Sequence, residues 1–221
     1  MKIIVLSCDK NQDTFEPFHH CMEKYYPNHP EVVYYTESVK NPYYRTISVP
    51  HELDTWTRGL REFLSRLDDD KCLLMVDDCF IRRPVDEKRI KEAAGLIRGN
   101  IALLNFEQSW DEADELTEHP GWKRRKHGSS YEVSIMCGIW DKTKLMQVIE
   151  RDSDPWTVEE EQNNCGFDYY INCGGQIIDW GYQTFKPAGI FKGKWCHEIV
   201  PFFEAEGIKV DYSTRRFSKI F

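Results

Sequence analysis

The chain has 221 residues, of which 41% are hydrophobic and 14% aromatic, a composition that excludes a disordered chain and suits one domain with a buried core. Its formal net charge of −8 argues against a surface coated for nucleic acid, although a local basic patch could still bind it. The sequence has no signal-peptide start, no apolar run of membrane-spanning length and no CxxC pair among eight cysteines, so we expect a soluble, cytoplasmic protein with reduced thiols and without a zinc site.

The first third of the chain predicts a β-α-β unit. Residues 2–8 are rich in β-branched side chains and show no helical period, which indicates a strand. Apolar residues at helical spacing predict a helix over 14–26, and residues 32–36 predict a second strand. This order is typical of a parallel sheet with crossover helices.

The centre of the chain holds a buried strand that stops at two carboxylates. After an irregular stretch over 42–51, a helix is predicted over 54–67, and four consecutive apolar residues at 73–76 predict a strand buried on both faces. Asp77 and Asp78 follow where this strand must end. Ligands gather outside the carboxyl ends of strands in open α/β sheets, and paired aspartates suit Mg²⁺ or Mn²⁺ bridged to a diphosphate. Alone, the pair is also compatible with a capped or salt-bridged turn.

The second half continues the alternation less regularly. The further elements expected are helices over 85–97, 142–150 and 154–161, strands over 101–106 and 132–140, and strand-like pieces at 176–180, 185–193 and 193–197. Residues 107–131 turn polar and uneven, which predicts a long surface loop that either closes over a substrate or lacks order.

Four motifs in this order give the chain a family resemblance: Asp77-Asp78 at the strand end, Gly138-Ile139-Trp140-Asp141, Pro155-Trp156-Thr157-Val158-Glu159, and Gly193-Lys194-Trp195. The chain resembles small bacterial and phage glycosyltransferases of the GT-A fold, roughly from Lys2 to His197. The motif Asp-Asp-Cys departs from the family's Asp-x-Asp, which puts the metal requirement in question.

The resemblance implies an α/β fold of one domain over 1–221, with a mixed, mostly parallel Rossmann-type sheet and flanking helices. A nucleotide-binding half at 1–106 and an acceptor half at 132–221 would flank the loop at 107–131. It implies Mn²⁺ or Mg²⁺, a nucleotide sugar of the UDP type as donor, and a location in the bacterial cytoplasm or a phage-infected host.

The resemblance also implies roles at the donor diphosphate. Asp78 would bind the metal, Asp77 would hold the metal or the sugar and ribose hydroxyls, and His197 would be a late metal ligand. Lys194 would neutralise the leaving diphosphate. The alternatives are a packed or surface histidine at His197 and an ordinary exposed lysine at Lys194.

Contacts to the base and ribose are expected from the loop after the first strand, at Ser7, Asp9 and Lys10, and from Trp56. These residues follow from the resemblance, in which the nucleotide lies against the ends of the first strands. The loop sequence itself shows only turn chemistry.

Transfer to a hydroxyl with inversion needs a carboxylate base, and Glu159 is the candidate. The alternative is that Glu159 complements a helix dipole with its acidic neighbours. Trp140 and Trp156 would stack on sugar rings as substrate-binding residues, unless they pack in the core.

The acceptor is expected to be a glycan or a hydroxymethylated base of phage DNA. A basic run, Lys123, Arg124, Arg125 and Lys126, would bind DNA with Trp122 stacking on a base, or would be a solvated loop. Two other functions stay open. One is a catalytically inactive nucleotide-sugar-binding module, and the other is a nucleotidyltransferase, which usually carries a glycine-rich phosphate loop that this chain lacks after its first strand.

Overall fold

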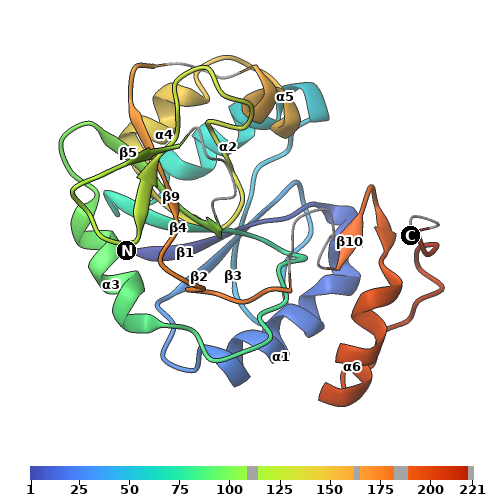
Figure 1. Ribbon diagram of the computed structural model, residues 1–221. Helices are drawn as coiled ribbons and strands as arrows, with labels where there is room; N and C mark the ends of the chain where they lie inside the picture. Colours follow the sequence, from blue (N-terminus) through green and yellow to red (C-terminus); the bar gives the residue numbers. More distant parts are fainter. Residues whose placement is uncertain (109–113, 162–164, 182–188, 219–221) are drawn as a thin grey trace.

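A nine-stranded mixed sheet lies between two layers of helices in the computed structural model (Figure 1). The structure describes residues 1–108, 114–161, 165–181 and 189–218. The strands of the main sheet are β1 Lys2–Leu6, β2 Val32–Thr36, β3 Arg45–Ser48, β4 Lys71–Val76, β5 Ile101–Gln108, β6 Glu115–Leu116, β7 Trp122–Arg124, β8 Gly138–Asp141 and β9 Asp168–Asn172. The helices are α1 Phe15–Tyr25, α2 Trp56–Ser65, α3 Glu87–Leu96, α4 Lys142–Val148, α5 Pro155–Glu160 and α6 Val200–Glu206, with 3₁₀ turns η1 Asp9–Thr14, η2 Leu53–Thr55 and η3 His197–Ile199.

The direction of the strands brings most of their carboxyl ends to one edge of the sheet. The strand order is β3-β2-β1-β4-β8-β5-β9-β7-β6. The first four of these strands are parallel, and β5 and β9 run in the same direction because β8 is antiparallel to both β4 and β5. The carboxyl ends of β1 to β5 and of β9 therefore share an edge with the amino end of β8, and we call this the carboxyl edge.

Alternation along the strands builds the two layers of the core. Ile3 and Val5 of β1 face the layer that holds α1, α3 and α6, whereas Ile4 and Leu6 face α2, α4 and α5. All four side chains are at most 6% exposed. Strands buried on both faces explain why these segments are apolar without interruption.

The C-terminal unit packs beside α1 rather than on the sheet (Figure 1). A two-stranded hairpin, β10 Ile190–Phe191 and β11 Lys194–Trp195, precedes η3 and α6. Phe80, which follows β4, stacks on Trp195 and meets Phe203 edge to face. The hydroxyl of Tyr25 donates to Oε1 of Glu206 at 2.7 Å. These contacts fix the chain's last third against its first.

The predicted class, an α/β domain with a mixed, mostly parallel sheet and flanking helices, is confirmed. The prediction of a long surface loop over 107–131 is wrong where β6 and β7 form, since β7 pairs with β9 and β6 with β7, whereas residues 117–121 and 125–131 form no helix or strand. Trp122, 5% exposed, anchors this hairpin against Phe106. Residues 109–113 of that loop lie outside the described residues.

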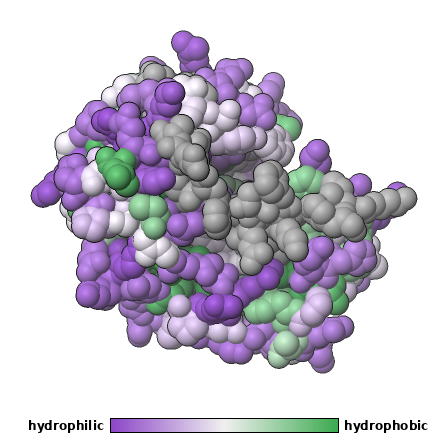
Figure 2. All heavy atoms as spheres, in the orientation of Figure 1, coloured by the Kyte–Doolittle hydropathy of each residue, from purple (hydrophilic) through white to green (hydrophobic). Residues whose placement is uncertain are grey.

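Further differences lie at short elements. Residues 42–51 contain β3, and no strand forms over 176–180. Of the piece expected at 185–193, residues 185–188 lie outside the described residues. Within the described ranges, no helix is long and apolar enough to cross a membrane. On the face shown in Figure 2, the described residues are mostly hydrophilic, and apolar ones form small separate patches.

Candidate functional site

Asp77 sits at the carboxyl edge, next to the end of the neighbouring strand. In the register between β1 and β4, Leu6 lies opposite Val76, so Ser7 and Asp77 are the next residues on two adjacent parallel strands. The hydroxyl of Ser7 donates to Oδ2 of Asp77 at 2.5 Å. This part of the predicted site therefore comes together as expected from strand geometry.

Asp77 uses both of its carboxylate oxygens within the protein. Its Oδ1 accepts a hydrogen bond of 3.0 Å from Nδ2 of Asn11, a residue of η1, and the side chain is 3% exposed. Burial and the adjacent charge of Asp78 raise the pKa of Asp77 above its ordinary range. Asp77 is thus held in place by the protein and has little room to act as a free ligand.

Asp78 is the carboxylate that can bind a cation. It is partly exposed, its pKa is raised by burial, and the backbone N–H of Ile190 in β10 donates to it. Among the described residues, no three histidine, cysteine or acidic side chains lie close enough together to hold a metal ion. One carboxylate beside a second buried one fits a hard cation such as Mg²⁺ or Mn²⁺ that takes its other ligands from phosphate oxygens and water.

A second carboxylate pair forms between α5 and the end of β5. Oε1 of Glu159 accepts hydrogen bonds from the hydroxyl of Ser134 at 3.2 Å and from the backbone N–H of Ile135 at 2.9 Å. The same hydroxyl lies 3.4 Å from Oε2 of Glu107. Burial, and to a lesser extent the charge of Glu107, raise the pKa of Glu159 to about 7, against the effect of these hydrogen bonds.

The two acidic groups share the carboxyl edge. Glu107 is the residue before the last of β5 and Asp78 follows β4, with the first residue of β8, Gly138, on the strand between them. The buried thiol of Cys79 is within electrostatic reach of both Asp78 and Glu107, whose charges, after burial, raise its pKa. The partly exposed carboxylate of Asp78 and a carboxylate with a pKa near 7, that of Glu159, therefore lie along one edge of the sheet.

Two tryptophans predicted to touch ligands are core residues. Trp140 is 0% exposed and packs edge to face on Tyr169. Trp56 is 7% exposed and contacts Tyr35, whose hydroxyl donates to the Trp56 carbonyl. The expectation that Trp140 stacks on sugar, and that Trp56 contacts the nucleotide, is corrected accordingly. The hydrophobic effect drives both rings into the layer beneath α2 and α4.

Asp9, which follows β1, stabilises the turn after β2 through hydrogen bonds. Its carboxylate accepts from the backbone N–H groups of Ser38, at 3.0 Å, and Val39, at 2.9 Å, which fixes the turn after β2. Lys10 is exposed. Only Ser7 of the three residues expected here makes a contact with the aspartate pair.

His197 and Lys194 lie on the C-terminal unit and are both exposed. The His197 ring stacks on Phe217 at a centroid distance of 4.3 Å. The structure therefore does not bring His197 into a ligand group with Asp78 across the described ranges.

The two arginines of the basic run pair with neighbouring carboxylates, whereas Lys126 is exposed. Arg124 pairs with Glu115 and lies 3.5 Å from Asp168, and Nη1 of Arg125 lies 3.6 Å from Asp114. Trp122 is buried and cannot stack on a base. This arrangement stabilises the β6–β7 hairpin and weakens the expectation of a DNA-binding patch.

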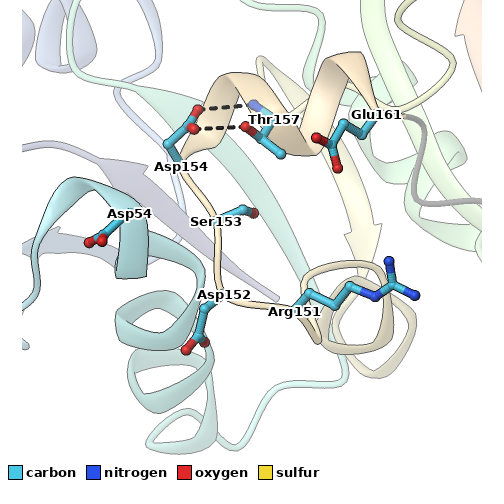
Figure 3. A pocket seen from close by; sticks show the side chains of 7 residues that line it. All are labelled: Asp54, Arg151, Asp152, Ser153, Asp154, Thr157 and Glu161. Carbon is cyan, nitrogen blue, oxygen red and sulfur yellow. Dashed lines mark hydrogen bonds between the residues drawn. The ribbon is translucent and has the colours of Figure 1, made fainter.

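A hollow of about 290 Å³ lies between η2 and α5 (Figure 3), and neither Asp77 nor Asp78 lines it. Two of its carboxylates have structural roles, since Asp152 pairs with Arg58 and Arg61, and Asp154 caps α5. Trp156, the neighbour of Asp154 on α5, is 60% exposed. Of the two tryptophans predicted to bind substrate, this one is accessible.

Sequence reasoning missed three residues that contact the predicted site residues: Asn11, Glu107 and Ser134. Glu107 follows a predicted strand at the carboxyl edge, and this position was a usable signal. Asn11 lies in η1 and Ser134 in the loop before β8, and their approach to the site depends on tertiary structure.

A scan against protein-family models finds no match, and a search of curated proteins finds none. Among solved structures, the chain is similar to a CMP:2-keto-3-deoxy-manno-octonic acid synthetase complexed with CTP, with 12% identity over 77% of this chain and 88% of that one and a TM-score of 0.51. It is similar to TarS of S. aureus, with 11% identity over 80% of this chain and 36% of that one and a TM-score of 0.50. It is also similar to the bifunctional IspDF from Campylobacter jejuni, with 13% identity and a TM-score of 0.45. This match covers 79% of this chain and 50% of that one.

At this level of identity, likeness establishes the fold and nothing finer. The chain has the GT-A-like fold of nucleotide-diphospho-sugar transferases and nucleotidyltransferases. A shared fold does not define substrates or reaction, which depend on the residues of the site.

Proposed function

We propose that this protein transfers a sugar from a nucleotide-sugar donor to a hydroxyl acceptor, with inversion and with help from a divalent cation. The observation that carries the proposal is the placement of two acidic groups along one edge, Asp77 with Asp78 and Glu107 with Glu159. Transfer to a hydroxyl needs both a site for the leaving diphosphate and a base for the acceptor proton.

In the proposed reaction, Glu159 takes the proton of the acceptor hydroxyl while that oxygen attacks the anomeric carbon. The bond from the anomeric carbon to the diphosphate oxygen breaks, and the nucleoside diphosphate leaves. Asp78 would hold Mn²⁺ or Mg²⁺, which when bound supplies positive charge to the leaving diphosphate. Asp77, buried and held by Ser7 and Asn11, would support Asp78 from the adjacent position rather than contact the ribose or sugar hydroxyls.

A pKa near 7 supports Glu159 as the base. A base works best when its pKa lies near the working pH, because it is then largely ionised and still holds a proton well. Hydrogen bonds from Ser134 and Ile135 hold one oxygen, so the other can face an acceptor.

A neutral glycan is the acceptor that the surface favours over DNA. The two arginines of the basic run are paired internally, whereas Trp156 offers an exposed ring on the helix that carries Glu159. Flat apolar rings stack well on sugars, and carboxylates near a DNA backbone would repel it.

Nucleotidyl transfer is the alternative within the same fold. It would be supported by a phosphate cradle after β1, where the chain instead forms η1, contains no glycine and uses Asp9 to fix the turn after β2. An inactive binding module would keep the donor site and lack turnover.

A thermal-shift screen tests the proposal. Wild type is mixed with UDP, GDP, CMP and TDP sugars, with and without Mn²⁺, and the screen is repeated with Asp78→Ala and with Asp68→Ala, an exposed aspartate of the turn before β4. We expect a metal-dependent rise in melting temperature that Asp78→Ala loses and Asp68→Ala keeps. If no nucleotide sugar raises the melting temperature of the wild type, the proposal is wrong.

Turnover separates the three functions. Release of nucleoside diphosphate from the stabilising donor supports glycosyl transfer. Release of pyrophosphate from a nucleoside triphosphate with a sugar phosphate would support nucleotidyl transfer, and binding without either product would support the inactive module.

A further inference from the structure

We propose that Arg215, near the end of the described chain, is a positioning residue for the donor site that acts on Asp77 through Asn11. The inference rests on the proposed function and assigns a role to the C-terminal segment, which would complete the site from the far end of the sequence.

Three side chains form a continuous chain of hydrogen bonds. Nη2 of Arg215 donates to Oδ1 of Asn11 at 3.1 Å, and Nδ2 of the same amide donates to Oδ1 of Asp77 at 3.0 Å. Asn11 and Arg215 are 204 residues apart in the sequence. The contact therefore exists only when the C-terminal segment is docked on η1.

The direction of these bonds fixes the orientation of the Asn11 amide. A guanidinium has only donors, so the amide oxygen must face Arg215, and the amide nitrogen then faces the carboxylate of Asp77. Without Arg215 the amide oxygen loses this donor, and only the bond to Asp77 then orients the amide. Arg215 therefore helps to hold the Asn11 amide in the orientation that donates to Asp77.

The guanidinium is itself held rigidly. Its Nε donates to Oδ2 of Asp13 at 2.8 Å, its Nη2 donates to the carbonyl oxygen of Lys10 at 3.0 Å, and its carbon lies 5.4 Å from the centre of the Trp195 ring. The Arg215 side chain is only 10% exposed. A planar guanidinium that is fixed on several sides is suited to holding the Asn11 amide in one orientation.

The test uses three variants: Arg215→Ala, Asn11→Ala and the double variant that carries both changes. The control is Arg216→Ala, which changes an exposed arginine at the next position. The probes are Mn²⁺ with UDP, GDP, CDP or TDP, and affinity is measured by calorimetric titration. We expect both single variants to bind the best nucleotide about 10-fold more weakly, a typical loss for a positioning contact. We expect the double variant to be no weaker than either single one, because the two residues act in one chain.

Arg216→Ala should bind like the wild type. Asp13→Asn, which removes the ion pair and leaves the bond from Arg215 to Asn11 possible, should lose less affinity than Arg215→Ala. Melting temperatures are measured for all variants, so a simple loss of stability is seen separately. If Arg215→Ala does not fold, Asn11→Ala carries the test, because it breaks the chain of hydrogen bonds at its middle.

The outcomes separate this inference from the proposed function. Wild type that binds no nucleotide with Mn²⁺ overturns the donor site and the inference with it. Wild type that binds, with Arg215→Ala or Asn11→Ala binding equally well, overturns the role of Arg215 alone. Strict additivity of the two losses would also overturn it, because independent effects do not pass through one amide.

Discussion

Glu159 and Glu107 face each other across a single hydroxyl. Oγ of Ser134 lies 3.2 Å from Oε1 of Glu159 and 3.4 Å from Oε2 of Glu107. A hydroxyl has one hydrogen to donate, so it cannot satisfy both carboxylates at the same time. Burial, and to a lesser extent the nearby charge of Glu107, raise the pKa of Glu159 to about 7, which supports its proposed role as a base.

Replacing Glu159 with glutamine should abolish transfer and leave donor binding intact. Glutamine keeps the size of the side chain but cannot accept the proton of the acceptor, and loss of a general base typically costs about 100-fold to 10,000-fold in rate. Steady-state rates and donor affinity of Glu159→Gln are compared with those of Glu160→Gln, an exposed neighbour on α5. A Glu159→Gln enzyme with more than a third of wild-type kcat removes this residue from the mechanism.

Glu107→Gln should shift the pH dependence of turnover. The charge of Glu107 is one of the causes that raise the pKa of Glu159 to about 7, so its removal lowers that pKa. Because the ionised base is the active form, kcat should rise with pH through about 7 in the wild type and at a lower pH in the variant. The measurement is kcat from pH 5 to 9. Identical midpoints would show that the two carboxylates do not interact.

Stability should also depend on the ionisation of Glu159. Its pKa rises from an ordinary 4.5 to about 7 on folding, so the unfolded chain releases the proton first as pH rises. The resulting cost to folding is absent below pH 4.5, grows between about 4.5 and 7, and is full above 7. After a discount for partial exposure, the cost is about 2 kcal/mol.

Urea unfolding of Glu159→Gln and wild type at pH 5 and pH 8 checks this. The unfolding free energy of the variant minus that of the wild type should be larger at pH 8 than at pH 5. The reason is that glutamine carries no charge at either pH, whereas Glu159 is ionised at pH 8. If the difference in unfolding free energy between the two proteins is the same at pH 5 and pH 8, the pKa of Glu159 is not raised.

Residues near the predicted strands were found from sequence because the strands are buried on both faces. The run Val32–Thr36 is a strand with the predicted bounds, and the apolar run before Asp77 forms β4 as expected. Once two parallel strands are aligned, their next residues must meet, which is why Ser7 lies against Asp77, a contact that the sequence analysis did not predict.

The rest of the site depends on long-range packing. β3 is short, polar and half-exposed at the edge of the sheet, so it has no apolar pattern. Ser134 reaches Glu159 only because the segment before β8 folds over α5, and Arg215 reaches Asn11 only after the C-terminal unit docks. The burial of the tryptophans could not be predicted either, since sequence spacing alone does not distinguish buried Trp140 from exposed Trp156.

Gly138 is expected to tolerate no side chain. A Cβ there would lie 2.8 Å from the carbonyl oxygen of Leu104 and 2.9 Å from Cδ1 of Leu103, at the first residue of the strand between the two acidic groups. Gly138→Ala should therefore cost about 2 kcal/mol of unfolding free energy through forced backbone shifts. Gly95, on α3, has open space around its Cα.

Gly95→Ala is the matched control. It should stabilise the protein by about 0.5 to 1 kcal/mol, because alanine favours a helix over glycine. Chemical denaturation of both variants measures the difference. Equal stability of Gly138→Ala and wild type would mean that the β5–β8 pairing at the carboxyl edge is looser than these distances imply.

Trp156→Ala should weaken acceptor binding with little effect on the fold. The ring is 60% exposed, so its removal uncovers little core, whereas a sugar ring stacked on it would lose an apolar contact worth about 0.5 to 1.5 kcal/mol. The KM for the acceptor should rise by up to about 10-fold, with kcat within about threefold of the wild type, because the contact is the same before and during transfer. Leu116→Ala, which removes an 85% exposed side chain on β6, is the control and should leave KM unchanged. A Trp156→Ala enzyme with wild-type KM for every acceptor that turns over would place the acceptor elsewhere on the carboxyl edge.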